Sequence, residues 1–254
     1  MEKLEFAKQL VIDAGELIKT MMDQPIDVEK KTSKSDLVTN VDKATETFIV
    51  EGIQERFEHQ TFLTEEKTVE SKVGDHMWII DPIDGTTNFI YQRENFSISV
   101  AYFYKEKPVF GIVYDVIKKD MYWAHIDLGA YLNDQRLEKL DQNQSLDSAL
   151  LSGDVYRPGM FRLSPAELKP KFITHRFLGS GALETAQVGA GKFQSYVFPK
   201  IKIWDIAAGL IILNMSGGTW LFGDKHDTFY FDDCERMFIA SSNNLIKDEL
   251  ITYL

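Results

Sequence analysis

The stretch of sequence that decides the fold is WIIDPIDGTTNF, residues 78–89. Its first three residues are apolar and predict a buried strand that ends at Asp81. Pro82 favours an extended conformation for Asp81 and fixes its own φ, so the chain turns in a defined way. Asp84 then lies three residues along, on the same side of a tight turn. The stretch therefore predicts two carboxylates brought together at one strand end.

The residues after these acids suit a phosphate. Gly85 permits close approach of the backbone, and Thr86 begins a short helix whose first N–H groups can bind an anion. Two carboxylates would repel that phosphate, each by about 4 kcal/mol at ~4 Å and an effective dielectric constant of ~20. Divalent cations reverse the sign, and oxygen ligands select hard ions such as Mg²⁺. Taken alone, the stretch is equally typical of an acidic turn with a helix cap.

Other carboxylates favour the metal hypothesis. Glu65 and Glu66 end the preceding strand, TFLTEE, and approach the same place if that strand neighbours residues 78–81. Asp205 is the only acid in the apolar stretch IKIWDIAAGLIILNMSGG, where an Asp is also typical of a helix N-cap. Together these acids predict metal-assisted phosphoryl chemistry.

Two helices open the chain. An apolar stripe from Leu4 to Met21 predicts the first, which Pro25 ends. Thr39 is a candidate N-cap of the second, with Asp42 three residues on as in a capping box. The predicted buried face of the second helix comprises Val41, Ala44, Phe48, Ile49, Ile53 and Phe57.

The remaining chain changes character near residue 140. Alternating patterns up to that point predict an antiparallel meander, with strands at 61–65, 76–81, 96–104, 108–114, 120–125 and 130–132. Beyond it, strands at 149–152, 172–178, 193–198, 219–222 and 237–240 alternate with helices at 164–168, 182–190, 204–215 and 244–254. We expect an α+β part over residues 1–140 and an α/β part over residues 141–254, sharing one interface.

Composition excludes several classes of protein. The net charge is −11, which disfavours binding to nucleic acid or to an anionic membrane. A single cysteine, Cys234, excludes an internal disulfide framework and a thiolate metal cluster. The start lacks signal-peptide character, and the longest apolar run, 206–213, is too short to span a membrane. We expect a cytoplasmic protein.

Several motifs resemble those of the inositol monophosphatase family. They are WIIDPIDGTTNF, WDIAAG at 204–209 followed by Gly217–Gly218, KTSKSDLVTNVD at 31–42, Glu65–Glu66, GIVY at 111–114 and GSGA at 179–182. The resemblance implies a five-layer α/β/α/β/α sandwich, as in inositol monophosphatase and fructose-1,6-bisphosphatase. It also implies a Mg²⁺-dependent, lithium-sensitive phosphatase that forms a homodimer and acts on a small phosphorylated metabolite.

The resemblance also implies roles for particular residues. The first metal would be held by Glu65, Asp81 and the carbonyl group of Ile83, and the second by Asp81, Asp84 and Asp205. A third, weaker ion near Glu65 is possible in the family, which gives two to three Mg²⁺ per site; Mn²⁺ is an alternative ion, while Li⁺ and Ca²⁺ would inhibit. The catalytic residues would be Thr86, Asp42 and Glu65, acting through a metal-activated water in an in-line displacement. Substrate would meet Gly85, Thr86, Gly179, Ser180, Gly181 and Phe198, and the loop that completes the site would contain Lys31 and Asp36.

Phe198 leaves the substrate open. Inositol-preferring members carry a Glu about seven residues before the Asp of WDIAAG, where this chain has Phe198. The ring either packs a strand end or changes specificity. Inositol monophosphate is the first expectation, and NADP(H) 2′-phosphate or fructose 1,6-bisphosphate is the alternative. A non-catalytic metal-binding regulator is a remote alternative, and a two-metal nuclease is disfavoured by the negative charge.

Overall fold

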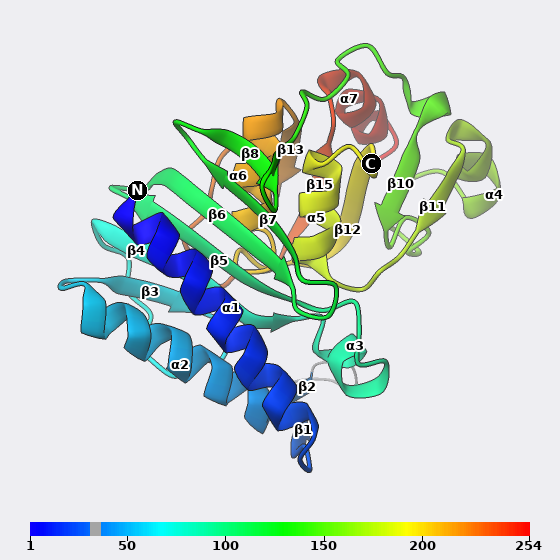
Figure 1. The fold of residues 1–254 in the computed structure, drawn as a ribbon. Coiled ribbons are helices and arrows are strands. Elements are labelled where there is room, and N and C mark those ends of the chain that lie inside the picture. The colour runs from blue at the N-terminus through cyan, green and yellow to red at the C-terminus, as the bar shows by residue number, and fades with distance from the viewer. Residues whose placement is uncertain (31–36) are drawn as a thin grey trace.

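The computed structural model describes residues 1–30 and 37–254. The chain forms a five-layer α/β/α/β/α sandwich, which confirms the fold expected from the sequence (Figure 1). Helices α1 and α2 cover one face of the larger sheet, α5 and α6 lie between the two sheets, and α7 covers the smaller sheet.

The elements have the following bounds. The helices are α1 (Glu2–Met22), α2 (Asn40–Arg56), α3 (Thr86–Tyr91), α4 (Pro165–Leu168), α5 (Gly181–Gly189), α6 (Ala207–Ser216) and α7 (Asn244–Thr252), with 3₁₀ turns η1 (Leu146–Ser148) and η2 (Lys169–Lys171). The strands up to residue 136 are β1 (Val28–Lys30), β2 (Leu37–Thr39), β3 (Thr61–Thr64), β4 (His76–Asp84), β5 (Ser97–Tyr104), β6 (Lys107–Asp115), β7 (Asp120–His125), β8 (Gly129–Leu132) and β9 (Gln135–Arg136). The later strands are β10 (Leu150–Gly153), β11 (Thr174–Arg176), β12 (Ser195–Ile201), β13 (Thr219–Phe222), β14 (Lys225–His226) and β15 (Arg236–Ser241).

The larger sheet follows the chain order. Over the described ranges it has seven strands, β3 to β9, each paired with its neighbour in sequence. The predicted meander is antiparallel from β4 onward, but β3 pairs parallel with β4, with Thr64 opposite Ile80. A parallel pair needs a crossover rather than a tight turn, and residues 65–75 supply that connection. The carboxyl ends of β3 and β4 therefore lie side by side.

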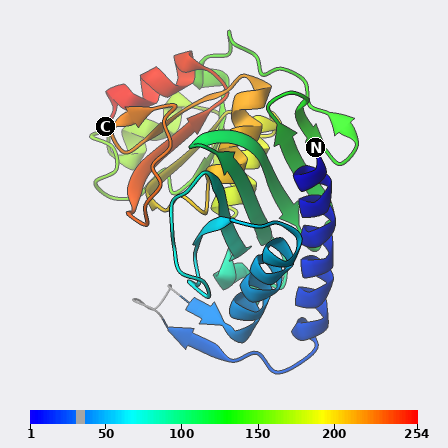
Figure 2. The same ribbon diagram turned by 90° about the vertical axis from the view of Figure 1, so that its left-hand side faces the viewer.

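The smaller sheet is mixed. In the described part of the chain it has six strands in the order β11-β10-β12-β15-β13-β14. Strand β10 pairs parallel with both β11 and β12, whereas β15 pairs antiparallel with β12 and β13. The two sheets face each other across α5 and α6 (Figure 2).

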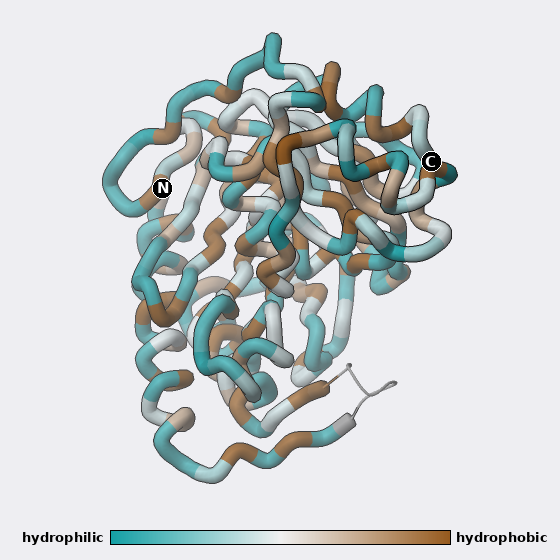
Figure 3. Tube along the Cα trace, turned by 90° about the vertical axis from the view of Figure 1, so that its right-hand side faces the viewer, coloured by the Kyte–Doolittle hydropathy of each residue, from teal (hydrophilic) through white to brown (hydrophobic). Residues whose placement is uncertain are grey.

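Apolar side chains fill the spaces between the layers. Figure 3 shows hydrophobic stretches running through the interior strands and helices, while hydrophilic stretches dominate the outer loops. Helix α6 is buried along almost its whole length and contacts β5, β6, β7 and β8. Among the described residues, no helix combines the length and the apolar character that crossing a membrane requires.

The buried face of α2 differs from the prediction. Phe48 was expected to be buried, yet it is 37% exposed. Asp42, Thr45 and Glu46 occupy the inward face instead, beside apolar Ile49. Hydrophobic periodicity misplaces this face because it treats acids as solvent-facing, whereas these acids accept hydrogen bonds inside the protein. The predicted capping box is present, with Thr39 as N-cap and Asp42 at the third helical position.

Strand β4 is longer than predicted. The chain does not leave the sheet at Asp81, because Asp84 is still paired opposite Ser97. The register shifts between Asp81 and Asp84, which places Pro82 in a bulge. A bulge is where a strand tolerates proline, since the missing N–H is not needed by the ladder. The two acids are thus separated by a bulge within one strand rather than by a tight turn.

One glycine brings the two halves of the chain into close contact. Gly111 on β6 lies against α6, and a Cβ atom there would come within 2.5 Å of the carbonyl oxygen of Ala208 and 2.8 Å of its Cα. These are backbone atoms, so a side chain at this position would push α6 away from the sheet.

Gly111→Ala is expected to lower the free energy of unfolding by about 1–3 kcal/mol through this overpacking. Urea denaturation followed by circular dichroism measures the change. Gly52→Ala in α2 is the matched control, because its Cβ would meet only the flexible end of Leu10. Alanine favours a helix interior by about 1 kcal/mol, so the control should be neutral or stabilising. Equal stability of the wild type and Gly111→Ala would contradict this account of the interface.

Candidate functional site

Three acids from separate parts of the chain meet at one end of the larger sheet. Glu65 follows β3, Asp81 lies on β4 and Asp205 lies in the turn before α6. Each offers one carboxylate oxygen, and these oxygens lie within 4.8 Å of one another. Parallel pairing places Glu65 here, because its N–H continues the β3–β4 ladder to the carbonyl oxygen of Ile80 at 3.2 Å.

The electrostatics of this cluster are unfavourable to negative charge. Burial raises the pKa of Asp81 well above its ordinary value, and the Glu65, Asp84 and Asp205 carboxylates raise it further. Burial also raises the pKa of Asp205, with further contributions from Asp84 and Glu65. Carboxylates gathered in this way need a positive charge between them to remain ionised.

The donor set suits a divalent cation. Glu65, Asp81 and Asp205 supply only oxygen atoms, and hard ions such as Mg²⁺ prefer oxygen ligands. Burial raises the pKa values of Asp81 and Asp205 and repulsion from neighbouring carboxylates raises them further, and a cation would relieve this repulsion. The residues present therefore fit a metal of this class.

Asp205 does not cap a helix. The N-cap position of α6 is Ile206, and no side chain bonds there. The Asp205 carboxylate instead accepts the Lys202 N–H at 3.0 Å and lines the same pocket as Asp81. The alternative interpretation of Asp205 as an N-cap is wrong.

Asp84 faces the same pocket but is held by α5. Its carboxylate accepts the Ser180 hydroxyl, the Ala182 N–H at 2.9 Å and the Gly181 N–H at 3.2 Å. Burial raises the pKa of Asp84 to about 6, although these three donors oppose the shift. Asp84 thus links β4 to the first turn of α5, and Ser180 and Gly181 lie against it.

Thr86 connects the strand end to α2. Its hydroxyl lies 3.3 Å from a carboxylate oxygen of Asp42 and 3.2 Å from the carbonyl oxygen of Ile83. Thr86 begins α3, whose N-cap is Gly85 with φ of 93°. A positive φ favours glycine, and a Cβ there would lie 3.2 Å from backbone oxygens of Asn95 and Gly179. Among the described residues, no side chain caps this helix.

These groups line a pocket of about 180 Å³. Its lining comprises Glu65, Asp81, Ile83, Asp84, Gly85, Thr86, Phe177, Gly179, Gly181, Tyr196, Phe198, Ile201 and Asp205. The structure thus brings together the acids, the Gly85–Thr86 turn and Phe198, which the family resemblance implied for one site, while Asp42 and Ser180 lie behind this lining and bond to Thr86 and Asp84. Lys31 and Asp36, expected in the flanking loop, lie outside the described residues.

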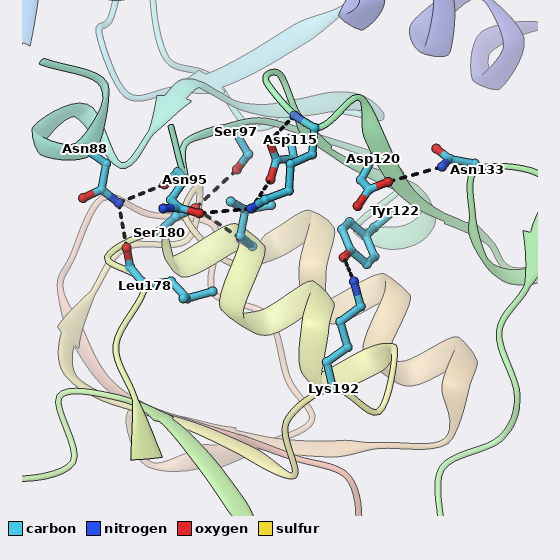
Figure 4. A network of polar contacts seen from close by, with 12 residues as sticks. Asn88, Asn95, Ser97, Asp115, Asp120, Tyr122, Asn133, Leu178, Ser180 and Lys192 are labelled. Atoms are coloured by element: carbon cyan, nitrogen blue, oxygen red, sulfur yellow. Dashed lines mark hydrogen bonds and ion pairs between the residues drawn. The ribbon is translucent and has the colours of Figure 1, made fainter. Parts of the chain in front are cut away.

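Two residues that were not predicted from the sequence fix the Gly179–Ser180 loop. Asn88 on α3 donates its side-chain amide to the Leu178 carbonyl oxygen at 2.7 Å, and to Asn95 (Figure 4). Glu184 on α5 is fully buried and accepts the N–H groups of Leu178 and Gly153, each at 3.1 Å. The N–H and the carbonyl group of Leu178 are therefore both hydrogen-bonded to buried side chains.

The signals for these two residues were present but weak. Asn88 lies within the WIIDPIDGTTNF stretch, and Glu184 is the single charged residue of the mostly apolar ALETA run. An acid among apolar residues marks a buried carboxylate, but its partners are remote in sequence and only the fold identifies them.

Glu184 should make stability depend on pH. Burial raises its pKa to about 8 from 4.5, so between these values the folded chain retains a proton that the unfolded chain releases. The metal-free protein should lose stability as pH rises through this window, by up to about 1.4 kcal/mol per pH unit. Glu184→Gln should remove this component of the slope in chemical denaturation with EDTA. The exposed-site variant Glu138→Gln should retain it, and identical slopes for all three proteins would refute the assignment.

Comparison with known proteins identifies the family. The model of the inositol monophosphatase family matches residues 1–254. The chain is 37% identical over 222 residues to inositol-1-monophosphatase of Bacillus subtilis, covering 85% of this chain and 83% of the relative. It is 36% identical over 255 residues to fructose-1,6-bisphosphatase/inositol-1-monophosphatase of Thermotoga maritima, covering 99% and 95%.

A solved structure agrees with this assignment. The crystal structure of an IMPase/NADP phosphatase complexed with Mg²⁺ and phosphate superposes with a TM-score of 0.83 at 27% identity, covering 94% of this chain and 89% of that one. The predicted resemblance is thereby confirmed. The chain belongs to the inositol monophosphatase family of metal-dependent phosphatases and is a phosphoric monoester hydrolase.

Proposed function

We propose that this protein hydrolyses a small phosphate monoester with Mg²⁺ bound at the Glu65, Asp81 and Asp205 cluster. The observation that carries the proposal is the convergence of these three acids in the pocket that contains the Thr86 hydroxyl. A metal-binding regulator without catalysis would need the acids but not the Thr86–Asp42 pair.

The proposed ligands follow the predicted set. Glu65, Asp81 and the Ile83 carbonyl would hold one ion, and Asp81, Asp84 and Asp205 another. Bound Mg²⁺ would supply an activated water and neutralise the phosphate. Two to three ions per site, replacement by Mn²⁺ and inhibition by Li⁺ or Ca²⁺ belong to the same proposal. Homodimer formation and a cytoplasmic location stay predictions.

The chain's own groups would perform the remaining tasks. The carboxylate of Asp42 accepts a hydrogen bond from the Thr86 hydroxyl, which leaves the Thr86 oxygen able to accept a hydrogen bond from a water and orient it at the pocket. The Gly85–Thr86 turn would offer backbone N–H groups to the phosphate. Asp84 accepts hydrogen bonds from the start of α5, so it fixes the position of the Ser180–Ala182 segment beside the Gly85–Thr86 turn.

Inositol monophosphate is the first proposed substrate, and the 2′-phosphate of NADP is the second. The second rests on the pocket wall, where Phe177 and Phe198 stand with ring centroids 6.0 Å apart. Phe177 is 55% exposed, so a ring of the substrate could stack on it. Fructose 1,6-bisphosphate, named for the Thermotoga relative, belongs in the same assay panel.

Asp81→Asn should abolish turnover and weaken Mg²⁺ binding, because it removes a charge shared by the proposed sites. Thr86→Ala should lower kcat by about 10²–10⁴-fold while changing Mg²⁺ affinity little, since its hydroxyl acts on the water. Phosphate-release kinetics and calorimetric Mg²⁺ titration measure the two effects. Wild-type turnover by Asp81→Asn would overturn the site. Wild-type protein that binds Mg²⁺ but releases no phosphate from a broad panel would favour the non-catalytic regulator.

Phe177→Ala distinguishes the two substrates. Loss of one stacking surface corresponds to about 1–3 kcal/mol, so kcat/KM for NADP should fall about 5- to 150-fold. The value for inositol monophosphate should stay within about threefold, because a polyol gains little from the ring. Ile173→Ala, at another exposed apolar residue outside the pocket, serves as the control. Equal effects on both substrates would eliminate the NADP assignment.

A further inference from the structure

Glu46 is a buried acid whose bonds all reach one short segment. It lies on α2 and is 0% exposed. Its Oε1 accepts the Thr64 hydroxyl at 2.9 Å, the Thr68 N–H at 2.7 Å and the Thr68 hydroxyl at 2.8 Å. Its Oε2 accepts the Glu66 N–H at 2.7 Å. These donors flank Glu65 on both sides.

A carboxylate in this setting determines the conformation of its surroundings. Burial of an ionised group is costly unless hydrogen bonds replace the lost water, and Glu46 receives four. Two of the donors are backbone N–H groups, so they fix the path of the chain rather than one rotamer. The N–H of Glu65 is itself bonded to Ile80. The backbone of Glu65 is therefore held before, at and after this residue.

Asp42 and Glu46 form a pair on α2. They are four residues apart, about 6 Å along the helix axis, and both face inward. Asp42 accepts a hydrogen bond from the Thr86 hydroxyl, and the capping box with Thr39 fixes the Asp42 side chain. Glu46 fixes the segment that carries Glu65. One turn of α2 thus contacts both the Thr86 hydroxyl and the segment that carries Glu65.

We propose that Glu46 is a positioning residue that holds the Glu65 carboxylate in place for the metal and at a set distance from Thr86. The inference rests on the proposed function, since it assigns Glu65 to a Mg²⁺ site. Glu46 does not face the pocket, whose lining includes Glu65 but not Glu46. It acts only through the Thr64–Thr68 segment.

Glu46→Gln tests the proposal. The substitution preserves size but turns one acceptor oxygen into an NH₂ group, which accepts no hydrogen bond. In one orientation of the amide the Glu66 N–H loses its acceptor, and in the other the Thr64 and Thr68 donors lose theirs. Loss of a residue that orients a metal ligand weakens metal binding about 10–100-fold, and we expect that loss for Mg²⁺ alone in isothermal titration. Amide hydrogen exchange at Glu66 and Thr68 should accelerate. At saturating Mg²⁺, kcat should recover to within about threefold of the wild type.

Thr45→Val is the matched control. Thr45 is the neighbour of Glu46 on α2, is equally buried, and its hydroxyl has no hydrogen-bond partner among the described residues. This variant should keep wild-type Mg²⁺ affinity and wild-type exchange at Glu66 and Thr68. A general loss of α2 stability would instead affect both variants alike.

The outcomes separate the inference from the proposed function. Folded Glu46→Gln with wild-type Mg²⁺ affinity and unchanged exchange would overturn the positioning role. If Glu46→Gln does not fold, Thr68→Val at an exposed position removes one donor and should weaken Mg²⁺ binding in the same direction; unchanged binding would again overturn the role. Failure of the wild type to bind Mg²⁺ would refute the proposed function itself. Faster amide exchange at Glu66 and Thr68 in Glu46→Gln would even then show that Glu46 holds this segment.

Discussion

The repulsion among Glu65, Asp81 and Asp205 is the interaction on which the site depends. Burial and mutual proximity raise the pKa values of Asp81 and Asp205, so the arrangement is unfavourable unless a cation neutralises it. The fold maintains this arrangement with ordinary elements. Parallel pairing of β3 and β4 sets Glu65 beside Asp81, and packing of α6 on the larger sheet presents Asp205.

Further buried acids surround this cluster, and each has hydrogen-bond donors of its own. Asp42 joins the start of α2 to Thr86, Asp84 joins β4 to α5, and Glu184 joins α5 to the Leu178 backbone. The bonds of Asp42 and Asp84 connect segments that are remote in sequence, and Glu184 also accepts the N–H of Gly153 on β10. Satisfied polar groups of this kind specify one arrangement of the core, because any slip leaves a buried acceptor without its donor. Acids therefore serve this protein both as candidate metal ligands and as ties between layers.

Much of the fold was predictable, because the apolar periodicity of the strands and of α1 is strong and the turn residues punctuate it. The acids of the candidate site were also predictable, since each lies within or at the end of an apolar run. Periodicity failed on α2, where it assigned Phe48 to the core and overlooked Glu46. It also ended β4 at Asp81, because a proline usually ends a strand and only the pairing with β5 reveals the bulge. The role of Asn88 depends on Leu178, 90 residues away in sequence. The role of Glu184 depends on Gly153, 31 residues away, and on Leu178, six residues away. One sequence does not identify such partners.

The seating of α6 on Gly111 has a thermodynamic consequence. Asp205 precedes this helix, whereas Glu65 and Asp81 belong to the sheet beneath it. An ion held by all three would act as a cross-link between layers, since separating the helix from the sheet would dismantle its coordination. Unfolding would then release the ion, and mass action would couple the melting temperature to the free concentration of the cation. In such a protein the supply of the cation sets the thermal stability of the fold as well as the rate of the reaction.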